Sequence, residues 1–393
     1  MAEVSDPQLS RRAFLGAPAW LARSGPPRVV VLMCDGFGPE YLDASRMPTL
    51  ARWGKDGIRK TVRGVMPSVT NANNASICCG VWPAVHGITG NSYWDERAGR
   101  EEYMESAALL LAPTLFERAA RHGVKSALLS SKRKTTTLLP RGTEFALTPE
   151  APPAEWVRLL GPAPGIYSRE INYWLLRAAI HLLKTRPDLG CLYVHTTDYP
   201  MHTWPPEALE SREHLARLDA LLAEAEAAAP GAAFLLTADH GLHHKSRCWD
   251  LEKACRNRGL PLRAAISAER DKYLVHHRGF GGTAWVYLNR PGDAERAAAM
   301  IERLPGVESV LSRPEAAGRF HLMPERIGEL MVTGDRDTVF GELDTESEAL
   351  PPAYRSHGGL SDTAVPLVVH NAPGAPAESY FQHNLDLARW LYV

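Results

Sequence analysis

Aspartate and histidine side chains stand at four separate places in the chain: Asp35, Asp198 with His202, Asp239 with His240, and His357. Singly, each has an ordinary explanation, because an aspartate after a strand is often a helix cap or a turn former. A lone histidine likewise more often satisfies a local hydrogen bond than binds a metal. Together they form a nitrogen and oxygen donor set suited to zinc or a similar divalent ion, and six ligands are too many for one tetrahedral centre. Two metal ions ~3.5–4 Å apart could clamp both sides of a phosphoryl displacement.

A nucleophile for such a site is offered by the stretch from Pro67 to Asn91, in which Thr70 precedes several asparagines and an apolar run closed by Gly80. This pattern is typical of a loop that enters a helix N-terminus, where backbone N–H groups and the helix dipole favour negative charge. A threonine hydroxyl is a poor nucleophile at neutral pH, but coordination to a dication favours its alkoxide. The alternative is that Thr70 is an N-cap residue beside solvated asparagines. Three asparagines are left without an assigned role: Asn71, Asn73 and Asn74.

The metal-binding residues follow elements that should deliver them to one place. Continuous apolar runs end in Asp35, Asp198 and Asp239, as strands buried on both faces do. In open parallel sheets, ligands bind beyond the carboxyl ends of the strands. Pro200 stands between Asp198 and His202, and if it occupies the first turn of a helix, the four-residue spacing points both side chains to one site.

Another apolar run, residues 126–131, leads directly into Lys132 and Lys134. Two lysines at a strand end could reach inward as point charges toward a small anion. An exposed basic turn is the alternative interpretation.

Predicted helices at residues 47–57, 113–123, 169–184 and 211–229 alternate with these strands, which indicates an α/β core. Residues 245–345 instead alternate short strands with one or two helices and suggest an inserted α+β cap. The core is then expected to comprise residues 28–244 and 346–393, closing with a strand over 365–370 and a C-terminal helix.

Composition excludes several classes of function. The formal net charge is −1 and no long block of one sign occurs, so neither a nucleic-acid surface nor a membrane patch is indicated, and a small-molecule partner is expected. Six scattered cysteines without a C-x-x-C pair indicate neither a zinc ribbon nor a disulfide framework. Beyond the N-terminus, no apolar stretch approaches the ~20 residues that span a bilayer.

Residues 1–27 are expected to form an N-terminal extension. Within it, Ser10 to Gly16 contains two adjacent arginines and resembles a twin-arginine export signal. Its apolar part is short and interrupted by Pro18, and no clean cleavage site follows. A cytoplasmic location is therefore favoured, with periplasmic export as the alternative.

In chain order, the motifs D-G at Asp35, P-S-x-T at Thr70, T-D-x-x-x-H at Asp198, T-A-D-H-G at Asp239 and S-H-G-G at His357 resemble those of the alkaline phosphatase superfamily. They are most similar to its nucleotide pyrophosphatase/phosphodiesterase branch, over about residues 28–370. Further motifs, including those at Asn91, at the two lysines and at residues 273–277, resemble the phosphonoacetate hydrolases of that branch. The resemblance implies a three-layer α/β/α sandwich with a mainly parallel central sheet and a smaller inserted α+β cap.

The resemblance also implies roles for individual residues. It assigns one zinc ion to Asp198, His202 and His357, and a second to Asp35, Asp239 and His240, with Thr70 as the nucleophile. It further implies that Asn91 donates to the phosphoryl oxygens and that Lys132 and Lys134 neutralise the substrate's carboxylate and phosphonate.

The expected activity is hydrolysis of the carbon–phosphorus bond of phosphonoacetate or a close relative through a phosphothreonine. The main alternative is a nucleotide pyrophosphatase/phosphodiesterase that acts on phosphodiesters with the same two-metal core. A phosphosugar or phosphoglycerate mutase is less favoured because a threonine leads the nucleophile loop, and a non-catalytic anion- or metal-binding protein is the alternative from another class. The sequence leaves the oligomeric state open, with a homodimer as one alternative.

Overall fold

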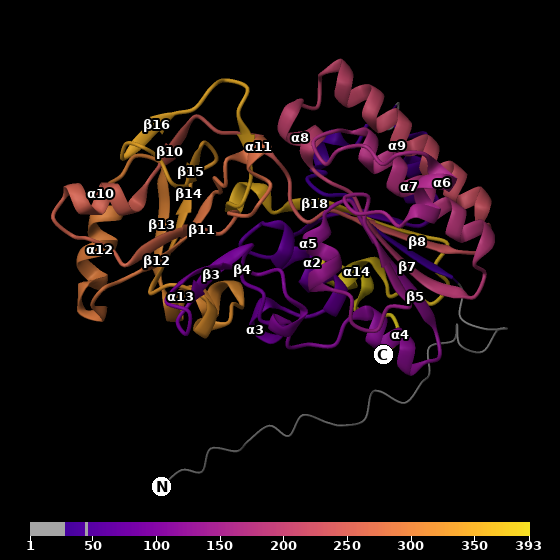
Figure 1. Cartoon of the computed structure of the whole chain (residues 1–393), viewed down its shortest axis with the longest axis horizontal. Helices are drawn as coiled ribbons and strands as arrows, with labels where there is room; N and C mark the ends of the chain where they lie inside the picture. Colours follow the sequence, from indigo (N-terminus) through magenta and orange to yellow (C-terminus); the bar gives the residue numbers. More distant parts are fainter. Residues whose placement is uncertain (1–27, 44–45) are drawn as a thin grey trace, which may run out of the picture.

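The computed structural model describes residues 28–43 and 46–393 and is organised around a seven-stranded sheet (Figure 1). Its strand order is β2-β18-β8-β1-β7-β5-β6. The five strands from β8 to β6 run parallel, whereas β18 runs antiparallel to both β8 and β2. The strands are β1 (Val29–Met33), β2 (Ile58–Arg63), β5 (Lys125–Ser130), β6 (Phe145–Leu147), β7 (Leu189–His195), β8 (Ala233–Thr237) and β18 (Ala364–His370).

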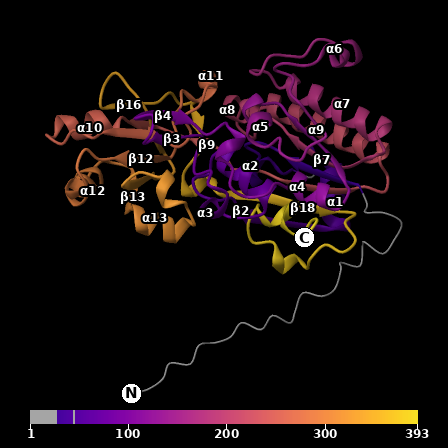
Figure 2. The ribbon, with the colours of Figure 1, turned by 60° about the horizontal axis from the view of Figure 1, so that its bottom comes forward.

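Helices cover both faces of this sheet, as Figures 1 and 2 show. One face carries α1 (Pro48–Asp56), α7 (Glu170–Thr185) and α9 (Leu209–Ala228), with α6 (Ala154–Leu160) packed on α7. The other face carries α2 (Thr70–Cys79), α4 (Leu115–Arg121) and α14 (Asp386–Arg389). The prediction of a three-layer α/β/α sandwich with a mainly parallel central sheet is therefore confirmed. The C-terminal helix expected from the sequence is α14, which is four residues long.

The predicted helices and strands of the core lie close to where the sequence placed them. Short elements complete it: α3 (Pro83–His86), α5 (Arg133–Leu138), α8 (Tyr199–Thr203) and the hairpin of β3 (Ser92–Asp95) and β4 (Arg100–Tyr103). All six cysteines have free thiols, as their spacing predicted.

A second group of sheets forms the insertion. In sequence it lies between β9 (His243–His244) and β17 (Arg355–Ser356), and these two strands pair antiparallel at its base. Its four-stranded sheet has the order β11-β12-β14-β13, and its three-stranded sheet the order β15-β10-β16. The four-stranded sheet comprises β11 (Ala264–Ser267), β12 (Thr283–Tyr287), β13 (Val307–Ser312) and β14 (Leu330–Gly334). The three-stranded sheet comprises β10 (Arg247–Trp249), β15 (Thr338–Phe340) and β16 (Ser347–Ala349).

Four helices belong to this insertion, more than the one or two expected: α10 (Leu251–Asn257), α11 (Leu274–His277), α12 (Ala294–Ile301) and α13 (Arg313–Phe320). Because β16 pairs with β10, the sheets of the insertion extend to residue 349, four residues past the boundary expected from the sequence.

The export-like segment lies outside the described residues. Among the residues that the structure does describe, none of the helices is long and apolar enough to cross a bilayer.

Helix α1 is anchored to α9 by a buried carboxylate. Met47 precedes the helix and provides no capping side chain, and Pro48 occupies its first position. Asp219 of α9 instead accepts hydrogen bonds from the backbone N–H groups of Thr49 and Leu50, both at 2.9 Å. One side chain therefore satisfies two N–H groups that a helix leaves without partners.

We predict that Asp219→Ala lowers the free energy of unfolding by about 1–3 kcal/mol, because two buried N–H groups lose their acceptor. Asp219→Asn keeps one acceptor oxygen and should lose less. Urea denaturation of both variants measures this, with Glu224→Ala as the control because Glu224 lies exposed on the same helix. Equal losses in Asp219→Ala and Glu224→Ala would contradict the anchoring role.

Candidate active site

The register of the parallel strands brings the predicted site residues to one edge of the sheet. Met33 of β1 pairs with His195 of β7 and Thr237 of β8, and Ser130 of β5 also pairs with His195. Two or three residues beyond these strand ends stand Asp35, Lys132, Asp198 and Asp239. Parallel strands in register end at the same edge, so these four side chains converge.

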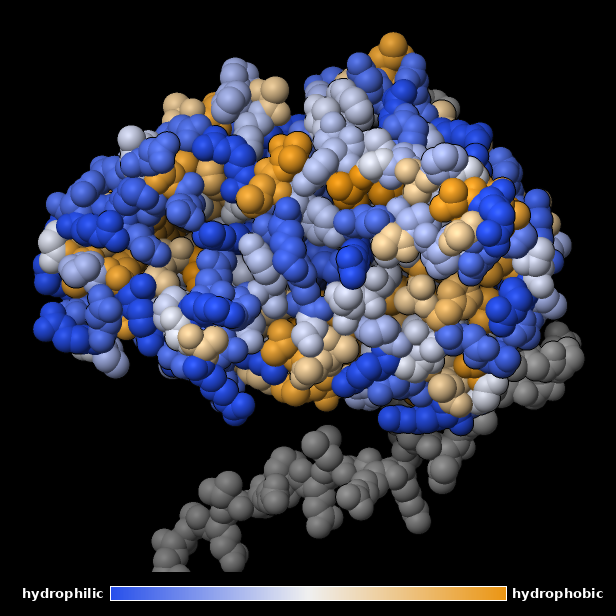
Figure 3. Space-filling model, in the orientation of Figure 1, coloured by the Kyte–Doolittle hydropathy of each residue, from blue (hydrophilic) through white to orange (hydrophobic). Residues whose placement is uncertain are grey.

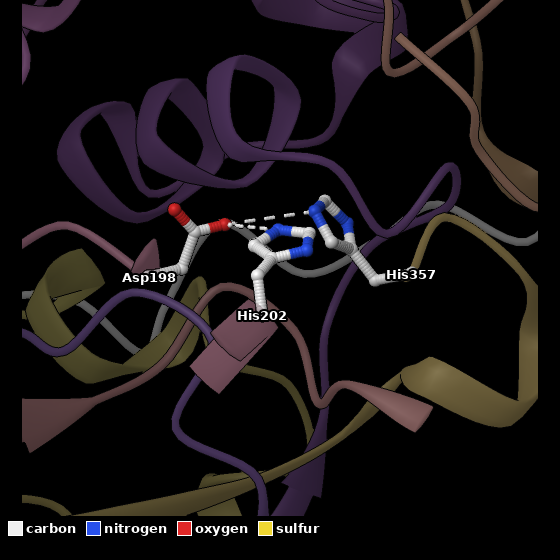
Figure 4. Close-up of side chains that lie close together, drawn as sticks. All are labelled: Asp198, His202 and His357. Carbon is white, nitrogen blue, oxygen red and sulfur yellow. Dashed lines mark hydrogen bonds and ion pairs between the residues drawn. The ribbon is translucent and has the colours of Figure 1, made fainter. Parts of the chain in front are cut away.

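The first group of metal-ligand side chains comprises Asp198, His202 and His357 (Figure 4). Pro200 lies in the first turn of α8, as expected, so that Asp198 and His202 face each other. His202 Nε2 lies 2.9 Å from Asp198 Oδ2, and His357 Nε2 lies 3.7 Å from the same oxygen. All three side chains are buried.

The second group comprises Asp35, Asp239 and His240, which are fully buried. His240 Nε2 lies 3.3 Å from Asp239 Oδ2 and 3.4 Å from Asp35 Oδ1. These three atoms have no hydrogen-bond partner among the described residues. Asp239 uses its other oxygen, Oδ1, to accept from the backbone N–H groups of Gly36 and His240.

Backbone carbonyls fix the tautomer of each of the three histidines. The Nδ1 atoms of His202, His240 and His357 lie 2.8, 3.1 and 2.9 Å from the carbonyl oxygens of Arg355, Gly241 and Ser68, respectively. A carbonyl only accepts, so each Nδ1 carries the hydrogen, and in the neutral ring each Nε2 keeps a free lone pair. This is the arrangement that orients a histidine for metal binding.

The two groups therefore consist of acceptor atoms that face one another inside the protein. Carboxylate oxygens and imidazole lone pairs at 2.9–3.7 Å repel each other unless a cation or a proton stands between them. Their mixed oxygen and nitrogen chemistry suits zinc or a similar divalent ion. The residues present fit the two metal sites that the sequence predicted.

Lys132 connects the two groups. Its Nζ lies 2.7 Å from Asp35 Oδ2 and 2.8 Å from Asp198 Oδ1. These two oxygens point away from the histidines of the two groups, because Asp35 Oδ1 faces His240 and Asp198 Oδ2 faces His202. Each aspartate can thus contact a metal ion with one oxygen and Lys132 with the other.

Around this site, buried lysines are fewer than buried carboxylates. Five buried carboxylates (Asp35, Asp198, Asp239, Glu269 and Asp271) accompany two buried lysines, Lys132 and Lys134. With neutral histidines the formal charge is −3, which two divalent cations would bring to +1. Burial and the like charge of Asp35 raise the pKa of the Asp239 carboxyl well above its usual range, and burial lowers the pKa of His240 to about 3.

Thr70 is the first residue of α2, and Val69, not Thr70, occupies the N-cap position. The alternative that Thr70 serves as an N-cap is therefore wrong. Its Oγ1 is buried and has no hydrogen-bond partner among the described residues. The loop before it is tied to the first metal group, because His357 donates to the carbonyl of Ser68. Thr70 thus offers an uncommitted hydroxyl at a helix N-terminus, two residues after the carbonyl that His357 contacts.

The three unassigned asparagines are buried, not solvated, and hold this loop in place. The side-chain amide of Asn73 bonds the backbone of residues 65, 67 and 69. Asn74 accepts from the Tyr193 hydroxyl at 2.8 Å, and the backbone N–H of Asn71 donates to Asn91 Oδ1 at 3.0 Å.

Like Lys132, the other two predicted substrate-binding residues have protein partners. Asn91 Nδ2 donates to the carbonyl of Glu269 at 3.1 Å, which leaves its second N–H for another acceptor. Lys134 Nζ lies 2.5 Å from Asp271 Oδ2, and both side chains are buried. Contact of these residues with a substrate stays a prediction.

Sequence reasoning assigned no role to five residues at the site, of which the last two belong to the motif noted at residues 273–277: His195, Glu269, Asp271, His276 and His277. His195 Nε2 lies 3.1 Å from Asp35 Oδ2, and His195 Nδ1 lies 2.8 Å from Ser130 Oγ. It orients a predicted metal ligand, and its place as the last residue of a buried strand was a usable signal. The other four come from the insertion, where the rule about strand ends in parallel sheets does not apply.

A family model described as type I phosphodiesterase / nucleotide pyrophosphatase matches residues 29–359. The chain belongs to this family. Its fold resembles the crystal structure of phosphonoacetate hydrolase from Sinorhizobium meliloti in complex with phosphonoformate, with a TM-score of 0.82 and 32% identity over 93% of this chain and 95% of that one. Murine ectonucleotide pyrophosphatase/phosphodiesterase 5 shares the fold at a TM-score of 0.67 and 15% identity, over 93% of this chain and 94% of that one.

Curated relatives match this chain over a shorter stretch. An ectonucleotide pyrophosphatase/phosphodiesterase of Caenorhabditis elegans is 41% identical over 70 residues, which are 18% of this chain and 8% of that protein. A bis(5'-adenosyl)-triphosphatase of Xenopus laevis is 33% identical over 73 residues, 18% of this chain and 16% of the relative. The predictions of the family and of the alkaline-phosphatase-like fold are confirmed.

The excess of buried carboxylates over lysines leads to a prediction about metal binding and thermal stability. In protein stripped of metal, Asp239→Asn should raise the melting temperature by roughly 2–4 °C, because it removes one uncompensated buried carboxylate while keeping Oδ1 as an acceptor. The same variant should lose most of the zinc-induced rise in melting temperature that the wild type shows.

Differential scanning fluorimetry with and without zinc measures both effects. Asp337→Asn is the control, because the Asp337 side chain is exposed. A lower melting temperature of metal-free Asp239→Asn, together with an unchanged zinc response, would refute the assignment of Asp239 to a metal site.

Proposed function

We propose that this family member is a zinc-dependent hydrolase that cleaves the carbon–phosphorus bond of phosphonoacetate or a close relative to phosphate and acetate. The observation that carries the proposal is the uncommitted, buried hydroxyl of Thr70, two residues after the Ser68 carbonyl that His357 contacts, together with the two groups of facing acceptor atoms. The choice of substrate is supported by the similarity to phosphonoacetate hydrolase over 93% of the chain.

In this proposal Thr70 Oγ attacks phosphorus in line, forms the O–P bond and loses its hydroxyl proton to solvent. When bound, two zinc ions would supply the positive charge that favours the Thr70 alkoxide and the equatorial phosphoryl oxygens. Asp198, His202 and His357 would hold one, and Asp35, Asp239 and His240 the other. The free N–H of Asn91 donates to a phosphoryl oxygen.

The difficult step is departure of carbon. The P–C bond breaks and its electron pair stays on the CH₂ carbon, where the adjacent carboxylate delocalises the charge as an enolate. Lys132 has three N–H donors, of which two face Asp35 and Asp198, so the third can stabilise this enolate. A proton from water completes acetate. A second water then hydrolyses the phosphothreonine, which releases phosphate and restores Thr70.

The alternative is a phosphodiesterase or nucleotide pyrophosphatase with the same core, which the family description favours. The two differ in the leaving group: a diester loses an alkoxide or a phosphate oxygen, neither of which requires a cation beside a carboxylate. Substrate preference therefore separates the two candidates.

Zinc-loaded protein should release phosphate from phosphonoacetate with a kcat/KM at least tenfold above its kcat/KM for a nitrophenyl phosphodiester. Parallel assays of phosphate and nitrophenol test this. Rapid turnover of the diester without cleavage of phosphonoacetate would reject the proposed substrate in favour of the phosphodiesterase.

Thr70→Ala should abolish turnover, by about 10³-fold or more, because the covalent route is lost. Its zinc content should match the wild type, since six other side chains carry the metal-binding role. Thr70→Ser retains a hydroxyl and should keep part of the activity, and Thr345→Ala, at an exposed threonine of the insertion, is the control. Acid quenching during turnover followed by mass spectrometry should detect phosphate on Thr70. A fully active Thr70→Ala protein would exclude the phosphothreonine.

A further inference from the structure

Glu269 is a buried carboxylate that has no role in the chemistry described so far. It follows β11, its side chain is 1% exposed, and neither of its oxygens has a hydrogen-bond partner within residues 28–43 and 46–393. The other four buried carboxylates of the site each contact a lysine or accept from a backbone N–H group. A buried carboxylate without a donor is strongly unfavourable, so Glu269 requires a cation or a proton from its surroundings.

The segment that carries Glu269 buries charge and exposes apolar side chains. It continues into α11, where Leu274 and Val275 are exposed, and Figure 3 shows hydrophobic atoms on the surface where this helix lies. This is the reverse of the usual distribution of charged and apolar residues. The partner of the Glu269 carboxylate must therefore lie inside the protein.

Glycines allow this part of the insertion to approach the loop that holds His357. A Cβ atom at Gly281 would lie 2.6 Å from Glu269 Cβ, and one at Gly282 would lie 2.6 Å from the backbone nitrogen of Gly359. The backbone N–H of Gly282 also donates to the carbonyl of His357 at 2.8 Å. Because no side chain separates these backbones, the Glu269 carboxylate reaches the His357 ring from the insertion.

The Glu269 carboxylate lies at the distance from His357 that two ligands of one ion have. Its Oε1 is 3.4 Å from His357 Nε2, the nitrogen that faces the first group. Two ligand atoms of a tetrahedral zinc ion, each about 2.0–2.1 Å from the metal, are about 3.3 Å apart. Within the first group, Asp198 Oδ2 lies 2.9 Å from His202 Nε2 and 3.7 Å from His357 Nε2. The separation of Glu269 from His357 falls between these two values.

The tautomer of His277 argues against a separate third metal site. The ligand atoms of Glu269, Asp271 and His277 do lie within 4.8 Å of one another. However, His277 Nδ1 accepts from the backbone N–H of Gly279 at 2.8 Å, so in the neutral ring Nε2 carries the hydrogen and donates toward Asp271, 3.1 Å away. His277 thus lacks the free lone pair that His357 presents, and Glu269 has its better ligand partner in His357.

We infer that Glu269 is a further ligand of the metal ion assigned to Asp198, His202 and His357, and that the insertion thereby completes a metal site built on the core. The inference rests on the proposed function, which places an ion at this group. Two carboxylates and two neutral imidazoles carry a formal charge of −2, which one divalent cation neutralises. No hydrogen bond holds the Glu269 carboxylate, so it is free to adjust to the ion. Because zinc can expand to five ligands, a water molecule or a phosphoryl oxygen can still bind.

Cobalt tests this inference, because the visible absorption spectrum of protein-bound Co²⁺ depends on the atoms that coordinate the ion. Asp239→Asn protein should retain the ion of the first group, and His202→Ala protein the ion of the second. Adding Glu269→Gln, which keeps the size of the side chain, should change the Co²⁺ spectrum of Asp239→Asn protein and weaken its Co²⁺ binding at least tenfold. In His202→Ala protein the same change should leave the spectrum unaltered, which also shows that the variant is folded.

Asp271→Asn is the control for charge, because it removes the same formal charge two residues away. In the Asp239→Asn background it should leave the Co²⁺ spectrum unchanged. An unchanged spectrum with Glu269→Gln in that background would overturn the inference. Tighter Co²⁺ binding would also overturn it, and would show that Glu269 pairs with a protonated His357 in the metal-free protein instead.

These measurements use no substrate, so the inference and the proposed function can fail separately. Wild-type protein that binds Co²⁺ and zinc but cleaves no phosphonoacetate would refute the proposed reaction, and the Glu269→Gln spectrum would still decide the role of Glu269. An enzyme that cleaves phosphonoacetate and has an unchanged Glu269→Gln spectrum would refute the inference alone. Wild-type protein that binds neither ion would refute both.

Discussion

The structure of the site depends on one electrostatic constraint, the burial of five carboxylates, three from the edge of the central sheet and two from the insertion. Two lysines balance only part of this charge, and unpaired buried carboxylates are strongly unfavourable. Lys132 reduces the imbalance where it is greatest, between Asp35 and Asp198, without occupying the oxygens that face the histidines. The remaining excess of buried negative charge favours the binding of divalent cations at this site.

Orientation of the ligands depends on three loops that are distant in sequence. The carbonyls of Ser68, Gly241 and Arg355 fix the histidine tautomers, so the nucleophile loop, the segment after β8 and the return from the insertion must all be in place. The loop before Thr70 therefore has two roles: it positions Thr70, and the carbonyl of Ser68 in it orients His357. A change in that loop should affect metal binding and nucleophile position together.

Much of the core could be predicted from sequence because its signals are local. Apolar runs that end in aspartate identify parallel strands and their active edge, and the four-residue spacing of Asp198 and His202 identifies a shared site. The residues of the insertion could not be found in this way. Glu269, Asp271 and His276 follow an antiparallel strand or lie in a one-turn helix, and they reach the site only through tertiary packing. The pairing of Lys134 with Asp271, across 137 residues, has no local signature either.

The core and the insertion also contribute different groups to the proposed chemistry. The core contributes the predicted nucleophile and all six predicted metal ligands, groups that in the proposed reaction act on phosphorus whatever leaves it. The insertion contributes the carboxylate of Glu269, and its Asp271 determines where the charge of Lys134 lies. Because discrimination between a carbanion and an alkoxide depends on charge beside the leaving group, the choice between phosphonate and diester should depend on Lys132 and on residues 269–277 rather than on the metal ligands of the core.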